Sequence, residues 1–269
     1  MTQELLDKYE KELKEFQDLI RTVPRLPQNL DKLLLLRFLK VYDFDMEKAK
    51  ELLIYNLEMR KKNPNLFEKR DVMSPEFQQS LRTMQICPMP KNTVENHKVS
   101  VFRLVDSDPE KYIYLDLCRT VVSMLDARFV MVDDNELIDG EIGVIDMTGF
   151  SFKHILKSAA NLSLVKNYMK YVQEAAPFKI VQNHFINCPG IMDKLMSLLK
   201  PFMKKEVLDT IKFHSSLESL YDTVSRDLLP NEFGGTAGSI DDIHKEWIKN
   251  LESKRDYLFN DDNWKLADE

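Results

Sequence analysis

Apolar side chains recur at helical spacing through the first 85 residues of the chain. Within residues 3–20 they stand three or four positions apart, which places them on one stripe of a helix. A second helix is predicted over 33–40 and a third over 45–63. A short fourth helix follows Ser74, a residue type that caps helix starts. These patterns predict a small all-helical unit in this part of the chain.

The hydrophobic period changes after residue 90. Short β-rich runs occur at four places, and helical patterns lie between them. The predicted strands are 99–105, 143–147, 178–186 and 211–213. The predicted helices are 121–132, 155–173 and 191–202, with a last amphipathic helix that starts within 239–242. Strands that alternate with helices predict a parallel or mixed sheet covered by helices. The CPMP segment at 87–90, between the two patterns, is interpreted as a linker.

Composition narrows the classes of function. Of the 269 residues, 43% are hydrophobic, which excludes a largely disordered chain. Lys and Arg number 38 against 44 Asp and Glu, and a chain with a net charge of -6 is a poor candidate for nucleic-acid binding. Three widely spaced cysteines and the lack of a signal-peptide core indicate a reducing, intracellular compartment. No apolar run is long enough to span a bilayer.

Candidate catalytic chemistry is sparse. Nucleotide-binding, zinc-protease and serine-hydrolase motifs do not occur, and no two of the five histidines stand four residues apart, so no catalytic centre and no metal site are predicted. His184, inside an apolar strand, is interpreted as a hydrogen-bonded core histidine. Asp146, at the end of another strand, is interpreted as a cap for the next loop. An enzyme that acts on a lipid through either residue stays an alternative.

The helical pattern after residue 190 is the most informative. A Pro-Gly turn leads into a helix that carries apolar side chains on most of its faces. Such a helix is buried or covers something apolar, and its methionines adapt to irregular shapes. A core helix packed on the sheet and a movable cover over an apolar cavity both fit the pattern. The residues of the candidate cover are Ile191, Met192, Leu195, Met196, Leu199, Phe202 and Met203.

Several short motifs resemble those of one protein family. The sequences HFINCP at 184–189, KPF at 200–202 and DLLPNEFGG at 227–235 resemble signatures of the CRAL-TRIO lipid-binding family. LRFLK followed by DFD near residue 40, and GVIDMTGF from residue 143, are similar to two further motifs of that family. The motifs occur in the family's order and span about residues 33–250. Within the family, the chain is similar to the α-tocopherol transfer and cellular retinaldehyde-binding proteins.

This resemblance implies an α/β fold with an internal cavity. An all-helical N-terminal domain over 1–90 would precede a CRAL-TRIO α/β domain over 91–250, with a C-terminal helix and tail over 240–269. The α/β domain would hold a mixed or parallel sheet with helices and an apolar ligand cavity, closed by the helix after residue 190 as a gate. By similar position, the cavity residues are Thr120, Ser123, Ala127, Ile145, Phe150, Phe178 and Met192. The first two would hold the polar end of a ligand.

The resemblance also implies a function. The chain would be a carrier, cytoplasmic and peripheral to membranes, that binds a retinoid, carotenoid, tocopherol or similar lipid and transfers it between membranes. No enzyme activity is implied, no cofactor is expected besides the lipid ligand, and the expected state is a monomer. The alternatives are an interaction module that senses membranes or phosphoinositides without transport, and a phospholipid exchange protein.

A basic cluster for phosphoinositide headgroups is a further feature of the tocopherol-transfer-like members. Lys179 occupies one of its positions, but uncharged or acidic residues occupy others. Those residues are Val181, Glu206 and Thr210. Lysines near them in sequence are candidates to substitute, or they form a solvated helix end. The candidate phosphoinositide or membrane contacts are therefore Lys179, Lys204, Lys205 and Lys212. The depleted cluster predicts little dependence of transfer on phosphoinositide.

Overall fold

One five-stranded mixed sheet organises the molecule. The computed structural model describes residues 2–131 and 136–267. The strands are β1 (Met84–Asn92), β2 (His97–Leu104), β3 (Gly140–Asp146), β4 (Ile180–Ile186) and β5 (Ile211–Phe213). They lie in the sheet in chain order, with β1 antiparallel to β2 and all other neighbours parallel. This arrangement confirms the predicted α/β architecture with a mixed sheet.

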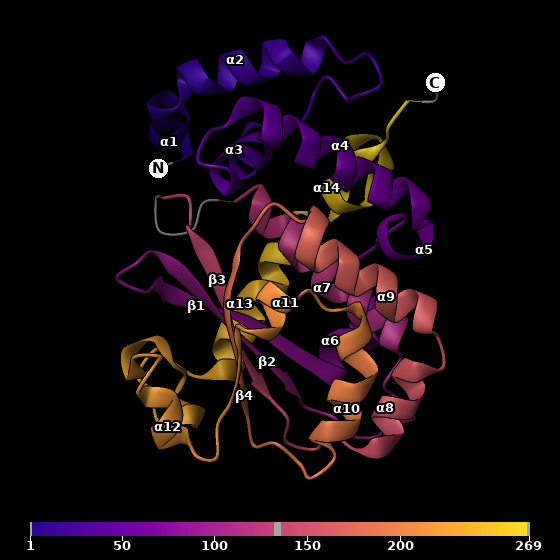
Figure 1. Cartoon of the computed structure of the whole chain (residues 1–269), viewed down its shortest axis with the longest axis vertical. Coiled ribbons are helices and arrows are strands. Elements are labelled where there is room, and N and C mark those ends of the chain that lie inside the picture. The colour runs from indigo at the N-terminus through magenta and orange to yellow at the C-terminus, as the bar shows by residue number, and fades with distance from the viewer. Residues whose placement is uncertain (1, 132–135, 268–269) are drawn as a thin grey trace.

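Six helices of the described residues precede the sheet, and the first of them lie above it in Figure 1. They are α1 (Thr2–Lys8), α2 (Glu10–Arg21), α3 (Lys32–Val41), α4 (Met46–Lys62), α5 (Pro64–Phe67) and α6 (Pro75–Thr83). The side chains of Asp31, Asp45 and Ser74 accept hydrogen bonds from backbone N–H groups at the starts of α3, α4 and α6, which fixes where each helix begins. The single helix predicted over 3–20 is in fact two helices that separate at Tyr9.

The remaining helices alternate with the strands or follow them. They are α7 (Tyr114–Phe129), α8 (Phe152–Ala159), α9 (Leu162–Lys170), α10 (Met192–Leu199), α11 (Lys205–Leu208), α12 (Leu217–Tyr221), α13 (Ile240–Ser253) and α14 (Arg255–Phe259). Short π- or 3₁₀-turns occur at η1 (Tyr171–Ala175), η2 (Lys200–Phe202), η3 (Arg226–Leu228), η4 (Asn231–Phe233) and η5 (Asp261–Trp264).

Two predicted helices have different bounds in the structure. The helix predicted over 155–173 is divided into α8 and α9, because the Asn161 side chain accepts from the Leu164 N–H and begins a new helix there. The helix predicted over 121–132 begins earlier, at Tyr114. Its predicted end at Val132 lies outside the described residues.

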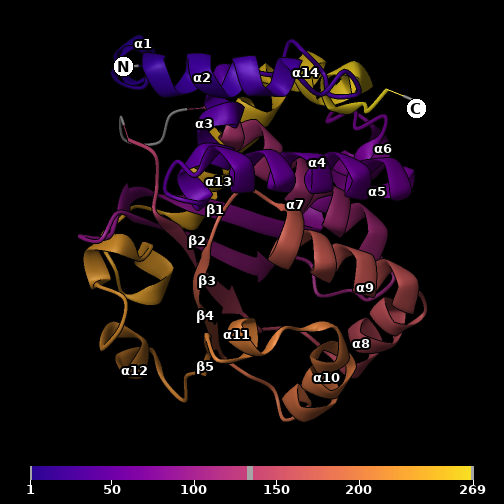
Figure 2. The same cartoon turned by 45° about the horizontal axis from the view of Figure 1, so that its top comes forward.

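The sheet separates two apolar regions (Figures 1 and 2). On one face, Val99, Val101 and Val144 pack against the segment that contains α12 and the turns before α13. On the other face, α7, α9 and α10 stand away from the strands and leave a cavity. The sheet therefore has one face that closes a solid core and one face that forms a cavity wall.

The segment at 87–90 is not a linker. It belongs to β1, where Cys87 and Met89 are buried and the Trp247 indole N–H of α13 donates to the Pro88 carbonyl at 3.2 Å. Because β1 is an edge strand, it tolerates prolines, which cannot donate to a neighbouring strand. The prolines made this strand look like a linker in the sequence. The strand also crosses the domain boundary expected between residues 90 and 91.

A buried ion cluster joins the N-terminal helices to the rest of the molecule. The Arg60 guanidinium donates to both carboxylate oxygens of Asp126 at 2.9 and 2.6 Å, and Arg70 donates to the same carboxylate at 2.5 Å. Tyr171 and the Trp264 ring also contact Arg60. Burial alone would raise the pKa of Asp126, but the two arginines hold that pKa below its usual value. Helix α4, helix α7 and the C-terminal segment therefore meet at one fully buried carboxylate.

Candidate functional site

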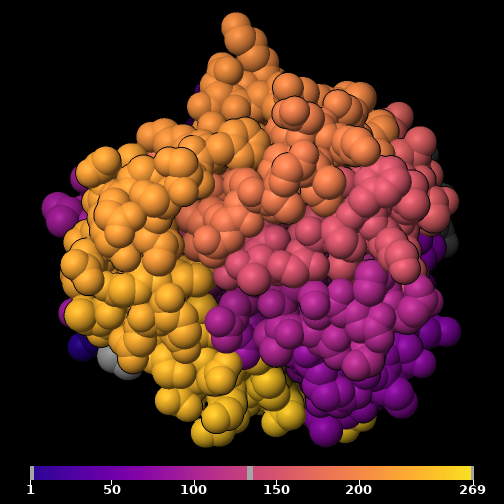
Figure 3. Space-filling model, turned by 90° about the horizontal axis from the view of Figure 1, so that it is seen from below, coloured from indigo at the N-terminus to yellow at the C-terminus, as the bar shows by residue number. Residues whose placement is uncertain are grey.

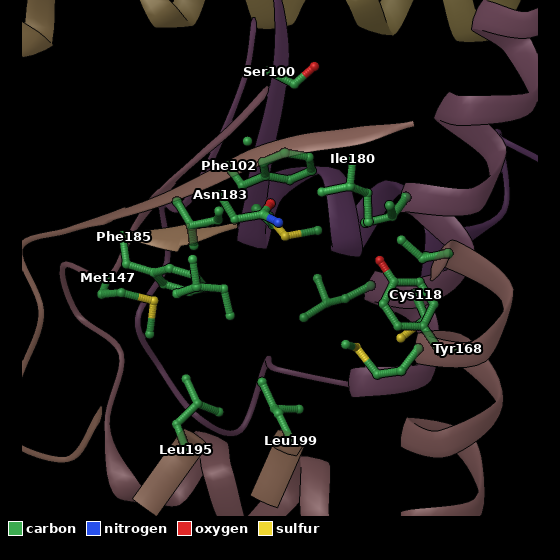
Figure 4. Close-up of a pocket in the computed structure, with 18 of the residues that line it drawn as sticks. Ser100, Phe102, Cys118, Met147, Tyr168, Ile180, Asn183, Phe185, Leu195 and Leu199 are labelled. Atoms are coloured by element: carbon green, nitrogen blue, oxygen red, sulfur yellow. The ribbon is translucent and has the colours of Figure 1, made fainter. Parts of the chain in front are cut away.

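An apolar cavity of about 380 Å³ lies between the sheet and helices α7, α9 and α10. Figure 4 shows Phe102 and Phe185 on the sheet side, Tyr168 on the helix side, and Leu195 and Leu199 of α10 across the opening between them. Its volume falls in the range of about 300–1,000 Å³ that is typical of small-molecule sites. The part of the cavity wall formed by these residues suits a hydrophobic guest.

Alternation along the strands determines which side chains reach the cavity. In β2, Ser100, Phe102 and Leu104 face it, while Val99 and Val101 enter the solid core on the other face. In β3, Gly143 and Ile145 lie beside them, in register with Ser100 and Phe102. The sheet therefore presents a layered wall in which a polar layer is followed by an apolar one.

Helix α7 presents one stripe to the cavity, at intervals of three and four residues. The residues of this stripe are Tyr114, Leu117, Cys118, Val121, Met124, Leu125 and Arg128. The predicted cavity residues Thr120, Ser123 and Ala127 belong to another stripe. Thr120 Oγ1 lies 2.7 Å from Ser80 Oγ in α6, and Ala127 packs in the cluster that contains Trp247 and Leu251 of α13.

These three residues were therefore assigned to the wrong side of α7. The physical reason is that almost every side of the helix is buried, from Leu117 and Cys118 on one stripe to Ser123 and Ala127 on another. Hydrophobic periodicity reveals a buried side only where another side is exposed to water. A helix enclosed all round gives no such contrast, so the side that faces the cavity is visible only in three dimensions.

The other predicted cavity and gate residues divide into two groups. The cavity wall includes Ile145, Phe150, Phe178, Leu195, Met196, Leu199 and Met203, together with Leu198, which was not predicted. Ile191 and Met192 lie instead at the start of α10, in a small cluster with Ile155 of α8. Phe202 lies in the 3₁₀-turn after α10, outside the cavity wall. Contact between any of these residues and a ligand stays a prediction.

The attachment of α10 differs at its two ends. At its C-terminal end, Gln173 of η1 donates to the Phe202 carbonyl at 3.0 Å and accepts from the Lys204 N–H at 2.8 Å. At its N-terminal end, the chain turns at Gly190, where an added Cβ would meet no atom within 4 Å. Pro201 limits the helix to eight residues. Helix α10 is therefore a short apolar cover, tied by side-chain hydrogen bonds at its C-terminal end and preceded by an open glycine turn at its N-terminal end.

The inner end of the cavity is polar. Arg128 Nη2 lies 2.8 Å from Glu141 Oε1, and the Ser100 hydroxyl lies 3.4 Å from Glu141 Oε2. All three residues are buried, and all three line the cavity. Figure 4 shows Ser100 at the end opposite Leu195 and Leu199. Sequence reasoning missed this cluster, although a glutamate two positions before Gly143 and four before Ile145, on the same side of a strand, is a usable signal.

Protonation leaves the middle of the cavity wall uncharged. Burial raises the pKa of the Cys118 thiol to about 12, and it raises the pKa of the Tyr168 hydroxyl well above its usual value. Both groups therefore stay neutral across the physiological range. A charged ligand would find no ionised partner at these positions.

The predicted basic residues do not gather in one described contact. Lys179 Nζ lies 3.6 Å from Asp43, and Lys204 Nζ lies 3.5 Å from Glu174. Lys205 is exposed at the start of α11, and Lys212 lies in β5 opposite His184. Two of the four lysines therefore already have acidic partners, and the predicted contact with phosphoinositide stays a prediction.

The two residues considered for catalysis are bonded to the protein itself. His184 is fully buried, with Nδ1 2.8 Å from His214 Nε2 and Nε2 2.9 Å from Gln182 Oε1. Asp146 Oδ1 accepts from the Thr148 N–H and from the Asn187 side chain. Both arrangements match the structural roles expected from the sequence. Across residues 2–131 and 136–267, no group of three acidic, cysteine or histidine side chains is placed to hold a metal ion.

An apolar cavity in an α/β domain, partly covered by a short apolar helix, is typical of a lipid-binding protein. The chain belongs to the CRAL/TRIO family: the family model described as "CRAL/TRIO domain" matches residues 82–235, more than half of the chain. A second model, "Pinta-like, UBA domain", matches residues 5–77. These matches confirm the predicted family and agree with a lipid-binding protein rather than an enzyme. Over the described residues, no helix is both long and apolar enough to cross a bilayer.

Individual relatives and one solved structure agree with this assignment. Clavesin-2 of Homo sapiens is 26% identical over 260 residues, which cover 96% of this chain and 76% of that protein. Clavesin-1 of Xenopus laevis is 27% identical over 233 residues, which cover 86% of this chain and 69% of that protein. The crystal structure of Sfh5 covers 91% of this chain and 97% of its own with a TM-score of 0.56 and 15% identity, which supports the fold alone.

Proposed function

We propose that this protein carries one small hydrophobic molecule, such as a retinoid, carotenoid or tocopherol, between membranes through a cavity gated by α10. The apolar cavity beneath α10 carries the proposal. Burying about 400 Å² of ligand surface at roughly 25 cal/mol per Å² would stabilise the complex against water by about 10 kcal/mol. Against a bilayer this advantage largely disappears, because lipid tails are also apolar. A gate that opens directly onto lipid therefore permits both loading and release.

The surface beside α10 supports contact with a membrane. On the neighbouring helix α8, Phe152 and Leu156 are 43% and 54% exposed. The Lys194 ammonium of α10 lies 4.6 Å from the centre of the Phe152 ring. Figure 3 shows the segments of α8 and α10 in one continuous surface. Apolar side chains that enter a bilayer, next to a cation that faces anionic headgroups, would place the gate against lipid.

The first test is direct identification of the ligand. Purified protein is incubated with a lipid extract, re-isolated, and analysed by mass spectrometry for molecules retained in stoichiometric amount. We expect one lipophilic species per chain. If extracts of several origins leave no stoichiometric lipid on the protein, the carrier function is contradicted.

Transfer depends on the membrane-facing side chains. We expect Phe152→Asp and Leu156→Asp to slow the movement of α-tocopherol between phosphatidylcholine vesicles at least about fivefold, because a carboxylate resists insertion into lipid. Equilibrium binding should be unchanged, since neither side chain lines the cavity. Phe259→Asp is the matched control, because Phe259 is 52% exposed on α14, far from α10 in Figure 1.

Two results of this assay would favour the alternatives. Binding of α-tocopherol without any acceleration of its transfer would indicate an interaction module. Acceleration only for phospholipid would indicate an exchange protein. A third set of vesicles containing phosphatidylinositol bisphosphate tests the basic residues, for which little effect is expected. A cytoplasmic location at the periphery of membranes is part of the same proposal.

A further inference from the structure

The polar end of the cavity gives information about the ligand. Ser100 and Glu141 lie on adjacent strands, and Arg128 reaches them from the last turn of α7. Arg128 is 3% exposed, Ser100 4% and Glu141 9%. A buried ion pair is costly to maintain where an apolar pair would fill the space, so it gives weak evidence of a role in stability. Its position on a cavity wall points to a role in binding.

The hydrogen bonds at this end show which polar groups of the cavity wall can form a further hydrogen bond with a ligand. Glu141 Oε1 is engaged by Arg128, and among the described residues the contact of Glu141 Oε2 is the one with the Ser100 hydroxyl at 3.4 Å. In the same layer of the sheet, the Asn183 side chain donates to Thr210 at 3.4 Å, and its carbonyl oxygen accepts no hydrogen bond within the described contacts. Figure 4 shows the Asn183 amide directed into the cavity. The inner end therefore offers acceptors on Glu141 and Asn183 beside the N–H donors of Arg128.

Lys98, the buried cation on the strand next to Glu141, lies outside the cavity wall. Lys98 is the strand partner of Glu141, and its ammonium donates to the Met89 carbonyl at 3.1 Å. A carboxylate head on a ligand would bring a second negative charge beside Glu141, which Arg128 already pairs, whereas a hydroxyl head could donate to the Glu141 carboxylate without adding charge.

We propose that Ser100, Arg128, Glu141 and Asn183 form a subsite for the hydroxyl group of the ligand. The ligand is then an otherwise apolar alcohol that enters with its hydroxyl first. Its body lies between the aromatic layer of Phe102 and Phe185 and the leucines of α10. Its apolar end lies under the gate, so it would leave into a bilayer with its hydrocarbon end first. This inference rests on the proposed carrier function.

The test uses three probes that share one hydrocarbon body: all-trans-retinol, its methyl ether and retinoic acid. Binding to the full chain is measured by quenching of tryptophan fluorescence. We expect retinol to bind at least about tenfold more tightly than the methyl ether, because an ether cannot donate a hydrogen bond to Glu141. Retinoic acid should bind no better than the ether at pH 7.4.

Variants identify the residues responsible for this preference. Single replacement of Glu141 leaves Arg128 buried without its carboxylate and risks misfolding. The double variant Arg128→Leu/Glu141→Leu keeps the space filled with apolar groups, and we expect it to bind alcohol and ether equally. Thr120→Val is the matched control, because Thr120 lies on α7 outside the cavity wall. It should keep the wild-type preference.

The outcomes separate this inference from the carrier function. Equal binding of retinol and its ether by the wild type, tighter binding of retinoic acid, or an unchanged preference in the double variant would each overturn the hydroxyl subsite alone. A lipid retained from extracts that has no hydroxyl group would do the same. Failure to bind any of the three probes, together with no lipid retained from extracts, would overturn the carrier function and the subsite with it.

Discussion

Helix α7 carries two buried charged residues whose surroundings differ. Asp126 accepts three hydrogen bonds from Arg60 and Arg70 at 2.5–2.9 Å and lies outside the cavity wall. Arg128, two positions later, reaches Glu141 at 2.8 Å on the wall of the cavity. The carboxylate of the first ion cluster is enclosed by protein and is held by both arginines. The second faces open space with capacity left over.

This difference separates a structural ion cluster from a binding one. A buried network of charged hydrogen bonds rigidifies the elements that it connects, here α4, α7 and the C-terminal segment. A pair beside a cavity can exchange part of its hydrogen bonding for contact with a guest. Burial and charge alone do not distinguish the two cases, since both carboxylates are at least nine-tenths buried. The space next to each carboxylate distinguishes them, because Glu141 borders the cavity and Asp126 does not.

The largest effect on stability is expected at Asp126. Asp126→Asn leaves two buried guanidinium groups without a carboxylate, and we expect the free energy of unfolding to fall by about 3–5 kcal/mol. Urea denaturation followed by circular dichroism measures the change. Asp71→Asn is the control: it disrupts the exposed pair with Arg255, and its unfolding curve should match that of the wild type. A loss below about 1 kcal/mol at Asp126 would remove the contrast between the two clusters.

An intermediate effect is expected at the cavity pair. Glu141→Leu should reduce the free energy of unfolding by about 1–3 kcal/mol, less than Asp126→Asn, because water or a ligand in the cavity can partly solvate Arg128. Arg128→Leu/Glu141→Leu should recover most of that loss, since an apolar pair needs no hydrogen bonds. The same urea titrations compare the single and double variants. A double variant no more stable than the single one would show that the pair itself stabilises the fold.

The smallest effect is expected from the pH response of His184. Burial, with His214 and Lys212 nearby, lowers the pKa of His184 from 6.5 to about 4. Between these values the unfolded chain binds a proton that the folded chain does not, so stability should fall as the pH is lowered from 6.5 towards 4. The slope from this residue is at most about 1.4 kcal/mol per pH unit. Urea midpoints measured across that range should fall less steeply for His184→Gln, and equal slopes would contradict this assignment.

Much of the fold was predictable because its signals are local. The cap at Ser74, the three-residue strand β5 and the strand containing His184 were expected at or near their observed positions. The prolines in β1 led to the wrong prediction of a linker at 87–90, because proline is compatible with an edge strand as well as with a linker. Helix α7 was predicted, but its start at Tyr114 was missed.

The site was less predictable than the fold, because a cavity forms where side chains from distant parts of the chain leave space, and no local pattern records that space. Ile145, Phe150 and Phe178 were predicted from the family resemblance, and they lie on the cavity wall. The polar end was assigned to Thr120 and Ser123, whereas Arg128 and Glu141 lie there. An arginine at a helix end and a glutamate at a strand start usually face water. Only the meeting of α7 with β3 buries these two, and no local pattern encodes that meeting.

The two prolines of β1 affect the tendency of the protein to aggregate through the edges of its sheet. An uncapped sheet edge can recruit strands from other copies and begin aggregation. Here Pro88 and Pro90 remove two N–H donors from one edge, and the opposite edge, β5, is only three residues long. Neither edge strand therefore presents a continuous row of backbone groups with which a strand of another molecule could pair. The sheet edges are therefore poor templates for aggregation, even next to a large apolar cavity.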